Sequence, residues 1–477
     1  MMNGQDAWQL HATTLSEAFS KLSLNPFDVM EAVLSRLDAV NPALNAVVLV
    51  DAAGARAAAA ASAERWRAGR PLSALDGVPV TVKDNIPVDG MRTTWGSPLF
   101  AENIAPADEI AVARLRAAGA VIWAKTNTPE LAMAGVTENP VFGVTRNPWD
   151  PTRIPGGSSG GAAAAVAAGA GPLALATDAA GSIRRPACYC GLVGIRPSTG
   201  RVARLPGAGD AAFPPLAGDF QVIGPIARSV ADAAMLLRAV SGPDPRDRAS
   251  AGLAPLPATL PVPARARIRV VSRLAGHPCD GAETAAAEAA AEALRRLGHE
   301  VSDGPAPWDP DEVNRLFGVV VNAGVARAVR PHAGWESRCT PVIRGMAEAG
   351  LRIGAADYLD ALDAIAALRA RALSDFGAFD ALLTPASTTL PWPIGTAFPA
   401  EIGGEKAGPR AGGVFSVFVN LLGLPAAALP GPLSPEGLPA GVQLAGRFGG
   451  DAEVIGLAAA LQGALWPEGL PRPPAYA

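Results

Sequence analysis

Two serine-containing segments and one lysine carry the residue types that are needed to activate a serine nucleophile. Ser158 lies in the run Gly-Gly-Ser-Ser-Gly-Gly at residues 156–161, and Ser182 lies in the segment TDAAGSIRRPA. Lys83 ends the segment VTVK upstream of both. A serine hydroxyl attacks well only when a base removes its proton, and a lysine can be that base when its amine is neutral. These residues could therefore form a nucleophile and a proton relay without a histidine.

The apolar residues before Lys83 could supply the low pKa that such a base needs. Residues 77–83, Gly-Val-Pro-Val-Thr-Val-Lys, form a β-branched run after a turn signal, which predicts a buried strand with Lys83 at its end. Burial disfavours the ammonium form and brings catalytic lysines to a pKa of roughly 7 to 8. The alternative is an exposed lysine at a strand edge, paired with Asp84. Position alone favours that alternative, and the serine motifs favour the catalytic one.

Each serine motif also has a simpler interpretation. Gly/Ser runs are usually flexible linkers, but this one is bracketed by Pro155 and an alanine-rich helix. A phosphate-binding loop would end in Lys-Ser or Lys-Thr, whereas alanine follows Gly161. Ser182 taken alone is typical of a turn or a helix cap. Only the combination with Lys83 favours catalysis.

Cysteines and histidines point to no other chemistry. The four cysteines (Cys188, Cys190, Cys279 and Cys339) are too few and too irregularly spaced for a disulfide framework or a zinc site, so Cys188 and Cys190 are expected to be small buried packing residues. The four histidines are scattered at positions 11, 277, 299 and 332, with none between the two serines. We therefore expect no metal site and no Ser-His-Asp arrangement.

Composition describes a packed globular protein with a small-molecule partner. The chain has 477 residues, of which 49% are apolar and 18% charged, with a net charge of −4. Neither sign of charge forms long runs, so nothing indicates nucleic acid as a partner. The amino terminus lacks the order of a secretory signal, and no stretch approaches the ~18 consecutive apolar residues of a membrane span. We expect no membrane association and a soluble cytoplasmic protein.

Helical and strand patterns alternate along the chain, which argues for an α/β layered fold. Helical patterns occur at residues 14–40, 51–68, 108–118, 162–168, 283–297 and 340–376. Strand patterns occur at residues 77–83, 121–124, 173–177 and 268–271, and residues 381–385 indicate a strand edge. Pro- and Gly-rich segments at 240–265 and 395–412 are predicted to be a boundary and a loop.

Lys83, the glycine-serine loop and the Ser182 segment resemble the amidase signature family in their order and spacing, with the two serines 24 residues apart. The resemblance covers most of the chain, through the segments LDGVPVTVKDNI, VIWAKTNTPELA, GLVGIRPSTGRV, IGPIARSVADAA, FVNLLGLPAAALPG and GLPAGVQLAGR. It implies an α/β fold with a large mixed central sheet flanked by helices on both faces, in a single domain 1–477. Within that domain we expect an N-terminal helical region (1–70), a signature core (71–240), a variable substrate-shaping region (241–410) and a C-terminal return to the core (411–477).

The resemblance also implies roles for these residues. Ser182 would attack an amide carbonyl to form an acyl-enzyme. Ser158 would relay the proton of Ser182, and the peptide bond between Gly157 and Ser158 would be cis. Lys83 would be the terminal base that receives the proton. The backbone N–H groups of Ala179, Ala180, Gly181 and Ser182 would form the oxyanion hole. This chemistry requires no cofactor.

Substrate recognition is expected to depend on residues around this machinery. Ala180 stands where the family commonly has glycine, so its methyl group could crowd the acyl group. Arg185 stands where many relatives have an apolar residue, and we expect it either to bind a substrate carboxylate or to bond loop carbonyls as a structural arginine. Arg184 is expected to be structural. Met133, Val136 and Gly157 are further candidates. Five aromatic residues could line the pocket or fill the core: Trp308, Phe317, Trp335, Trp392 and Phe415.

Three functional classes remain open. The first is a stand-alone amidohydrolase that cleaves a small amide or urea-type C–N bond and releases ammonia or an amine. The alternative is the glutaminase (A-type) subunit of an aminoacyl-tRNA amidotransferase complex, which would need partner subunits. A non-catalytic relative is the third, and the presence of Lys83, Ser158 and Ser182 argues against it. The sequence does not fix the oligomeric state, and a homodimer is the prior expectation because such assemblies are common.

Overall fold

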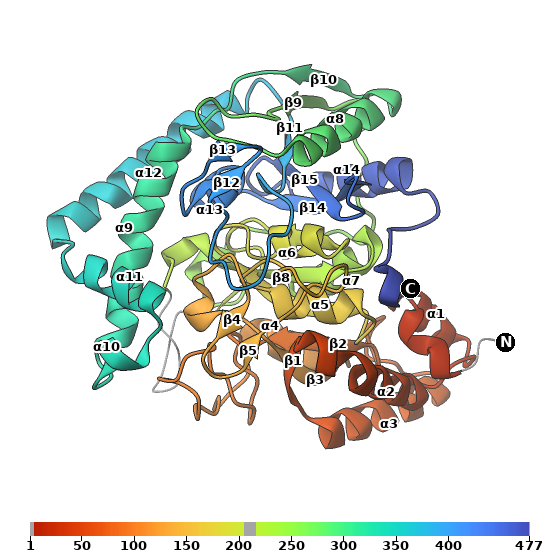
Figure 1. The fold of residues 1–477 in the computed structure, drawn as a ribbon. Helices are drawn as coiled ribbons and strands as arrows, with labels where there is room; N and C mark the ends of the chain where they lie inside the picture. The colour runs from red at the N-terminus through yellow and green to blue at the C-terminus, as the bar shows by residue number, and fades with distance from the viewer. Residues whose placement is uncertain (1–3, 205–215, 477) are drawn as a thin grey trace.

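An 11-stranded sheet runs through the structure, a computed structural model that describes residues 4–204 and 216–476 (Figure 1). Its strands come from all four regions of the chain. In spatial order they are β1 (Val47–Val50), β3 (Val121–Thr126), β2 (Pro79–Lys83), β6 (Leu173–Asp178), β8 (Val222–Ala227), β7 (Val193–Arg196), β14 (Ala426–Leu433), β15 (Pro439–Gly446), β11 (Ala381–Pro385), β9 (Arg267–Val270) and β10 (Glu300–Asp303).

Strand directions make the sheet mixed. β3, β2 and β6 are parallel to one another, the strands from β6 through β8, β7, β14 and β15 to β11 pair antiparallel, and β11, β9 and β10 are again parallel. Parallel strands bring their carboxyl ends to one edge of the sheet, where sites commonly form. Lys83 lies at such an end, opposite Thr126 of β3. The predicted α/β fold with a mixed central sheet is confirmed.

Helices pack on both faces of this sheet. α5 packs against β6 and α6 against β14, and these two helices contact each other. α4, α7, α14 and α8 contact one another in turn, and α9 packs with α11 and α12 at the side of the sheet (Figure 1). The helices are α1 (Ala12–Ser20), α2 (Pro26–Leu44), α3 (Ala52–Arg67), α4 (Ile110–Ala117), α5 (Gly160–Ala167), α6 (Arg184–Tyr189), α7 (Val230–Val240), α8 (Gly281–Arg296), α9 (Pro310–Val329), α10 (Trp335–Arg338), α11 (Pro341–Leu351), α12 (Ala355–Asp375), α13 (Val417–Leu421) and α14 (Asp451–Leu465). None of the helices in the described residues combines the length and apolar character of a membrane span.

Three sequence expectations are corrected by the structure. The helical pattern at 14–40 is two helices, because Asn25 caps a new helix through its side chain and Pro26 occupies the first position of that helix. The strand at 381–385 lies between β15 and β9 and not at a sheet edge. The loop at 395–412 contains a short hairpin of β12 (Glu401–Ile402) and β13 (Glu405–Lys406).

Helix α5 fixes the position of the glycine-serine loop that precedes it. Every residue of α5 is buried, and all but one are glycine or alanine. A Cβ atom on Gly161 would lie 2.6 Å from the carbonyl oxygens of Ala46 and Asn127. The small residues therefore let the helix approach the backbone beside β1 and β3 closely, and this approach sets where the preceding Ser158 and Ser159 lie.

We expect Gly161→Ala to destabilise the protein by about 1–3 kcal/mol, because the added methyl group meets backbone that must move. The matched control is Gly463→Ala in α14, where nothing lies within 4 Å of the new methyl group, and it should raise stability by up to about 1 kcal/mol. The thermal unfolding midpoints of the two variants measure both effects. Equal midpoints would contradict the close packing of α5.

Candidate active site

Lys83 ends strand β2 with its side chain fully buried. Its Nζ forms hydrogen bonds with three hydroxyl oxygens: Ser158 Oγ at 2.7 Å, Ser159 Oγ at 2.9 Å and Thr177 Oγ1 at 3.1 Å. Burial holds the pKa of Lys83 well below its ordinary value, and the charge of Asp178 opposes this only in part. A pKa lowered in this way favours the neutral amine that a base requires.

The alternative of an exposed Lys83 paired with Asp84 is wrong. Asp84 forms its ion pair with Lys125, at 3.6 Å between Oδ1 and Nζ, and both side chains are buried. Burial lowers the pKa of Lys125 to about 8, while Asp84 opposes this shift. Lys125 also donates to the carbonyl of Ile86 and to Thr93 Oγ1. Two buried lysines thus end neighbouring strands, but within the described residues only Lys125 has a carboxylate partner.

The two serine loops lie side by side. The N–H group of Ser159 donates to the carbonyl of Ser182 at 3.2 Å, and the peptide between Gly157 and Ser158 is cis, as the family resemblance implies. Ser158 is buried, whereas Ser182 is partly exposed. The predicted residues are therefore arranged from a partly exposed serine inward to a buried lysine.

Asp178 organises the loop that carries Ser182. Its carboxylate accepts hydrogen bonds from the N–H groups of Gly181 at 2.7 Å and Ile183 at 3.1 Å. The N–H group of Gly181 is therefore not open to a substrate oxygen, contrary to the expectation for that residue. Among the described residues, the N–H groups of Ala179, Ala180 and Ser182 have no hydrogen-bond acceptor. These three remain as oxyanion-hole candidates.

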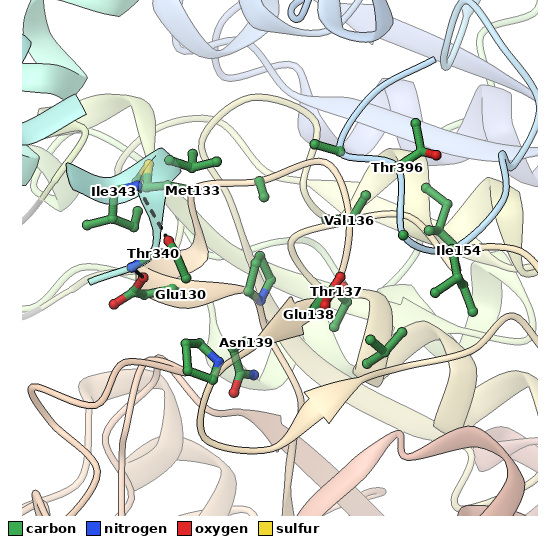
Figure 2. Close-up of a pocket in the computed structure, with 18 residues that line it drawn as sticks. Glu130, Met133, Val136, Thr137, Glu138, Asn139, Ile154, Thr340, Ile343 and Thr396 are labelled. Atoms are coloured by element: carbon green, nitrogen blue, oxygen red, sulfur yellow. Dashed lines mark hydrogen bonds between the residues drawn. The ribbon is translucent and has the colours of Figure 1, made fainter. Parts of the chain in front are cut away.

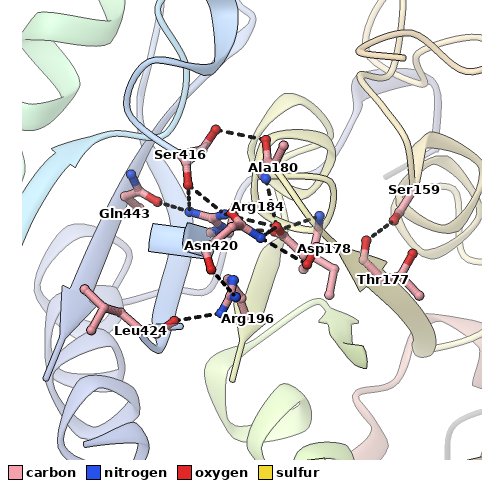
Figure 3. A network of polar contacts seen from close by, with 12 residues as sticks. Ser159, Thr177, Asp178, Ala180, Arg184, Arg196, Ser416, Asn420, Leu424 and Gln443 are labelled. Carbon is pink, nitrogen blue, oxygen red and sulfur yellow. Dashed lines mark hydrogen bonds and ion pairs between the residues drawn. The ribbon is translucent and has the colours of Figure 1, made fainter. Parts of the chain in front are cut away.

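A buried network behind the loop ties distant parts of the chain to it (Figure 3). Arg184 binds both carboxylate oxygens of Asp178 at 3.0 Å, and it also donates to Asn420 Oδ1, to Gln443 Oε1 and to the carbonyl of Ser416. Burial alone would raise the pKa of Asp178, but the charge and hydrogen bonds of Arg184 hold that pKa below its ordinary value. The expectation that Arg184 is structural is thus confirmed.

Ser416 closes the loop from its other side. Its hydroxyl donates to the carbonyl of Ala180 at 3.0 Å, and a Cβ atom on Gly181 would lie 2.6 Å from Ser416 Oγ. Gly181 also has a φ of +94°, so both its space and its backbone conformation require glycine. Sequence reasoning missed Asp178, Ser416, Asn420 and Gln443 as site residues, although three of them lie in family segments, TDAAGSIR, FVNLLG and GVQLAG.

Arg185 presents a buried guanidinium beside the Ser182 loop. Only 9% of the residue is exposed, and no hydrogen bond or ion pair of its side chain is found among the described residues. Its Nη1 lies 2.8 Å from where a Cβ on Gly135 would be, and its Nη2 lies 3.9 Å from that position on Gly181. Burial lowers the pKa of Arg185. The expected structural role, bonding loop carbonyls, is thus not what these residues show.

A cavity of about 350 Å³ opens beside the segment 133–139 (Figure 2). Met133 and Val136 line it, together with Ile154, Ile343 and others, but Lys83 and the three serines of the two loops are not among its lining residues. The carbonyls of Ala134 and Val136 also pack against Gly157, where an added Cβ would lie within 2.7 Å of both oxygens. This segment therefore joins the cavity to the Ser158 loop. Contact of Met133, Val136 and Gly157 with a substrate stays a prediction.

The aromatic residues mostly fill the core. Trp308 stacks on Phe418 with 3.7 Å between ring centroids, and Trp335 and Phe415 belong to the same hydrophobic cluster, against which Phe317 packs. Trp392 lies apart from them, near Gly135 and Tyr189. All four cysteines are buried and free, and Cys188 and Cys190 are packing residues as expected.

Comparisons with known proteins find similar sequences over most of the chain. The family model described as Amidase matches residues 28–455. The A-type subunit of the glutamyl-tRNA(Gln) amidotransferase from Symbiobacterium thermophilum is 35% identical, covering 94% of this chain and 95% of that protein, and the protein of the same name from Chloroflexus aurantiacus is 35% identical over 92% and 94%.

Solved structures of two kinds are similar. A 6-aminohexanoate cyclic dimer hydrolase, complexed with substrate, has a TM-score of 0.86 and 30% identity, covering 99% of this chain and all of that one. The A-type subunit of the glutamyl-tRNA(Gln) amidotransferase from Thermotoga maritima has a TM-score of 0.76 and 29% identity, covering 96% and 95%.

We expect Asp178→Asn to destabilise the protein by about 3–5 kcal/mol at pH 7, because it leaves the buried charge of Arg184 without its partner. Since the pKa of Asp178 is lowered in the folded state, its contribution is present above the unfolded pKa of about 4 and is lost as the pH falls further.

The matched control for Asp178→Asn is Asp380→Asn. Asp380 pairs with Arg267 and Arg447 at the surface, and its loss should cost no more than about 1 kcal/mol. Thermal unfolding midpoints at pH 7 measure both variants. A similar drop in the two midpoints would argue against the buried pair as the support of the loop.

Proposed function

We propose that this chain, which belongs to the Amidase family and is a hydrolase of C–N bonds, cleaves its substrate through an acyl-enzyme on Ser182. The observation that carries the proposal is the buried Lys83 amine, 2.7 Å from Ser158 Oγ and without a carboxylate partner among the described residues. A buried amine of this kind is a base of the strength that serine activation needs.

The first half of the reaction moves one proton inward and forms one bond. Ser182 Oγ bonds to the amide carbon while the carbonyl π electrons move to its oxygen. The proton of Ser182 passes to Ser158 Oγ as the proton of Ser158 passes to Lys83 Nζ. When the tetrahedral intermediate collapses, the C–N bond breaks and the leaving nitrogen takes a proton back from Lys83 through Ser158. Water then attacks the acyl ester by the same relay and frees Ser182.

The developing oxyanion would be bound by main-chain donors of the Ser182 loop. The proposed donors are the N–H groups of Ala179, Ala180 and Ser182, since that of Gly181 is bound to Asp178. A single donor of this kind contributes ~2.7–4 kcal/mol to transition-state stabilisation. The network of Asp178, Arg184 and Ser416 would hold these donors in place before the substrate arrives.

The substrate that we propose is the side-chain amide of glutamine, hydrolysed by this chain as the A-type subunit of an aminoacyl-tRNA amidotransferase. The support is the pair of curated relatives described above, both named as the A-type subunit of a glutamyl-tRNA(Gln) amidotransferase and both matched nearly end to end. The sequence alone favours a stand-alone amidohydrolase, with the amidotransferase subunit as the alternative. The comparisons instead favour the amidotransferase subunit. The partners would then be the other subunits of the complex instead of a second copy of this chain.

The second candidate is the stand-alone small-molecule amidohydrolase, and one observation favours it. The backbone superposes better on the 6-aminohexanoate cyclic dimer hydrolase, with a TM-score of 0.86, than on the amidotransferase subunit of Thermotoga maritima, with 0.76. The relay of Ser182, Ser158 and Lys83 is the same in both candidates.

Arg185 fits a substrate with a carboxylate in either candidate. Its guanidinium is buried near the Ser182 loop and forms no ion pair or hydrogen bond among the described residues, although the charge of Asp178 acts on it from a distance. A planar guanidinium binds a carboxylate through two parallel hydrogen bonds, and glutamine has such a carboxylate. We therefore propose that Arg185 orients the acyl part of the substrate.

Ammonia release by the purified chain tests the proposed function, with Ser182→Ala as the blank. The assay takes glutamine, aliphatic and aryl amides, acidic monoamides and ureas, first with the chain alone and then with the other subunits of its source organism's amidotransferase. We expect glutamine to be the substrate, with weak turnover alone and faster turnover in the complex. Turnover of another amide by the chain alone would favour the second candidate, and release that persists in Ser182→Ala would contradict the acyl-enzyme.

Arg185→Met should raise the KM for a carboxylate-bearing amide about 10- to 100-fold, because hydrogen bonds between charged groups contribute roughly 1.5–3 kcal/mol. The KM for a neutral amide should change little. Arg185→Lys keeps the positive charge but loses the planar guanidinium. Its KM for the carboxylate-bearing amide should therefore lie between those of the wild type and Arg185→Met. Steady-state kinetics with a matched acidic and neutral substrate measure this preference, and an unchanged preference in Arg185→Met would contradict the carboxylate role.

A further inference from the structure

Lys83 Nζ has two hydroxyl neighbours that the proposed relay does not use. Ser159 Oγ lies at 2.9 Å and Thr177 Oγ1 at 3.1 Å, and both residues are buried. Burial removes water as an alternative partner for these groups. Their hydrogen bonds therefore determine how the lysine amine is oriented.

Ser159 Oγ accepts a hydrogen bond from Lys83 Nζ through a lone pair. Its hydroxyl donates its one hydrogen to the carbonyl of Thr177, at 3.2 Å, so it can only accept from Nζ.

Thr177 Oγ1 also accepts from Lys83 Nζ, at 3.1 Å. Asn85 donates through Nδ2 to Thr177 Oγ1 at 2.9 Å, which fills one of the two lone pairs of this hydroxyl. The second lone pair is then available to an N–H group of Lys83. Asn85 is itself almost fully buried, so its hydrogen bond to Thr177 is shielded from water.

A neutral amine has two N–H donors and one lone pair. When Ser159 and Thr177 each accept one N–H, the lone pair is left for the third neighbour, Ser158. We propose that Ser159 and Thr177, the latter held by Asn85, are positioning residues that aim the lone pair of neutral Lys83 at the hydroxyl of Ser158. This inference rests on the proposed function.

The arrangement gives the relay its direction. The hydroxyl of Ser158 donates into Nζ, and this leaves its own lone pair free for the proton of Ser182. After the transfer, the ammonium of Lys83 has three N–H donors and three hydroxyl acceptors around it. Ser159 and Thr177 thus orient the base before the transfer and stabilise its charge afterwards, which partly offsets the cost of burial.

Modification of Ser182 by an alkyl fluorophosphonate tests this inference without knowledge of the natural substrate. Ser182 Oγ bonds to phosphorus, fluoride leaves, and the serine proton passes through Ser158 to Lys83, so the second-order rate constant measures activation of the nucleophile. The variants are Ser159→Ala and Thr177→Val. The rescue variant is Thr177→Ser, and the matched control is Thr81→Val, a buried threonine in β2 whose hydroxyl reaches only the carbonyl of Leu173.

We expect Ser159→Ala and Thr177→Val each to lower this rate constant about 10- to 100-fold, as loss of an oriented base should. The pH of half-maximal rate should also fall, because the ammonium of Lys83 loses an acceptor and its pKa drops. A purely structural role would change the unfolding midpoint and leave that pH in place. Thr177→Ser keeps the hydroxyl and should retain a rate within about threefold of the wild type. Thr81→Val leaves the orientation of the base unchanged and should retain a rate within about twofold.

The outcomes separate the inference from the function on which it rests. Wild-type rates and pH profiles in both Ser159→Ala and Thr177→Val would overturn the inference alone, and so would a slow Thr177→Ser that matches Thr177→Val. If Thr177→Val does not fold, Ser159→Ala and Thr177→Ser still decide the question. No labelling of the wild type at Ser182 would overturn the proposed function itself.

Discussion

Burial of a lysine amine without a carboxylate partner is the constraint on which the site depends. Lys83 and Lys125 are both fully buried at the ends of neighbouring strands, but Lys125 has Asp84 at 3.6 Å, whereas the hydrogen-bond partners of the Lys83 amine in the described part of the chain are hydroxyl oxygens. The pKa of Lys125 is lowered to about 8, and that of Lys83 falls well below its ordinary value. The nearby charge of Asp178 is paired with Arg184, and it opposes the lowering of the Lys83 pKa only in part. In the proposed mechanism, one carboxylate partner thus distinguishes the structural lysine, Lys125, from the base, Lys83.

The mixed sheet explains how segments that are far apart in sequence meet at this amine. Parallel pairing of β2 and β6 brings Lys83 to the same edge as Thr177 and Asp178. The loop that follows β6 carries Ser182, and α13 and β15 bring Asn420 and Gln443 against Arg184 (Figure 3). Because these last contacts join residues more than 230 positions apart, the loop reaches its final shape only when the C-terminal strands are in place.

The sequence predicts the local parts of this site and misses the long-range ones. Lys83 at a strand end is predictable from the β-branched run before it, because such a run has a local signature. The ion-pair partner of Asp84 is not predictable in this way, because Lys125 is distant from it in sequence. In register, Lys83 lies opposite Thr126 and Lys125 lies opposite Val82, so the two lysines point to opposite faces of the sheet. The prediction that the N–H group of Gly181 belongs to the oxyanion hole is wrong for a similar reason. The partner of a backbone donor depends on how its loop folds, and the residue types alone do not predict that fold.

Arg185, like Lys83, is a buried basic side chain, but it cannot become neutral as a lysine can. A buried lysine can give up its proton and become neutral, whereas a guanidinium keeps its charge at any pH that proteins meet. Burial lowers the pKa of Arg185, and the charge of Asp178 opposes this only in part, since no carboxylate of the described residues forms an ion pair with Arg185. A buried charge without a partner is costly, and a carboxylate from outside the chain would relieve that cost. In the proposed function, the two basic residues beside the Ser182 loop would therefore have different roles: Lys83, neutral, would take a proton, and Arg185, charged, would bind an anion.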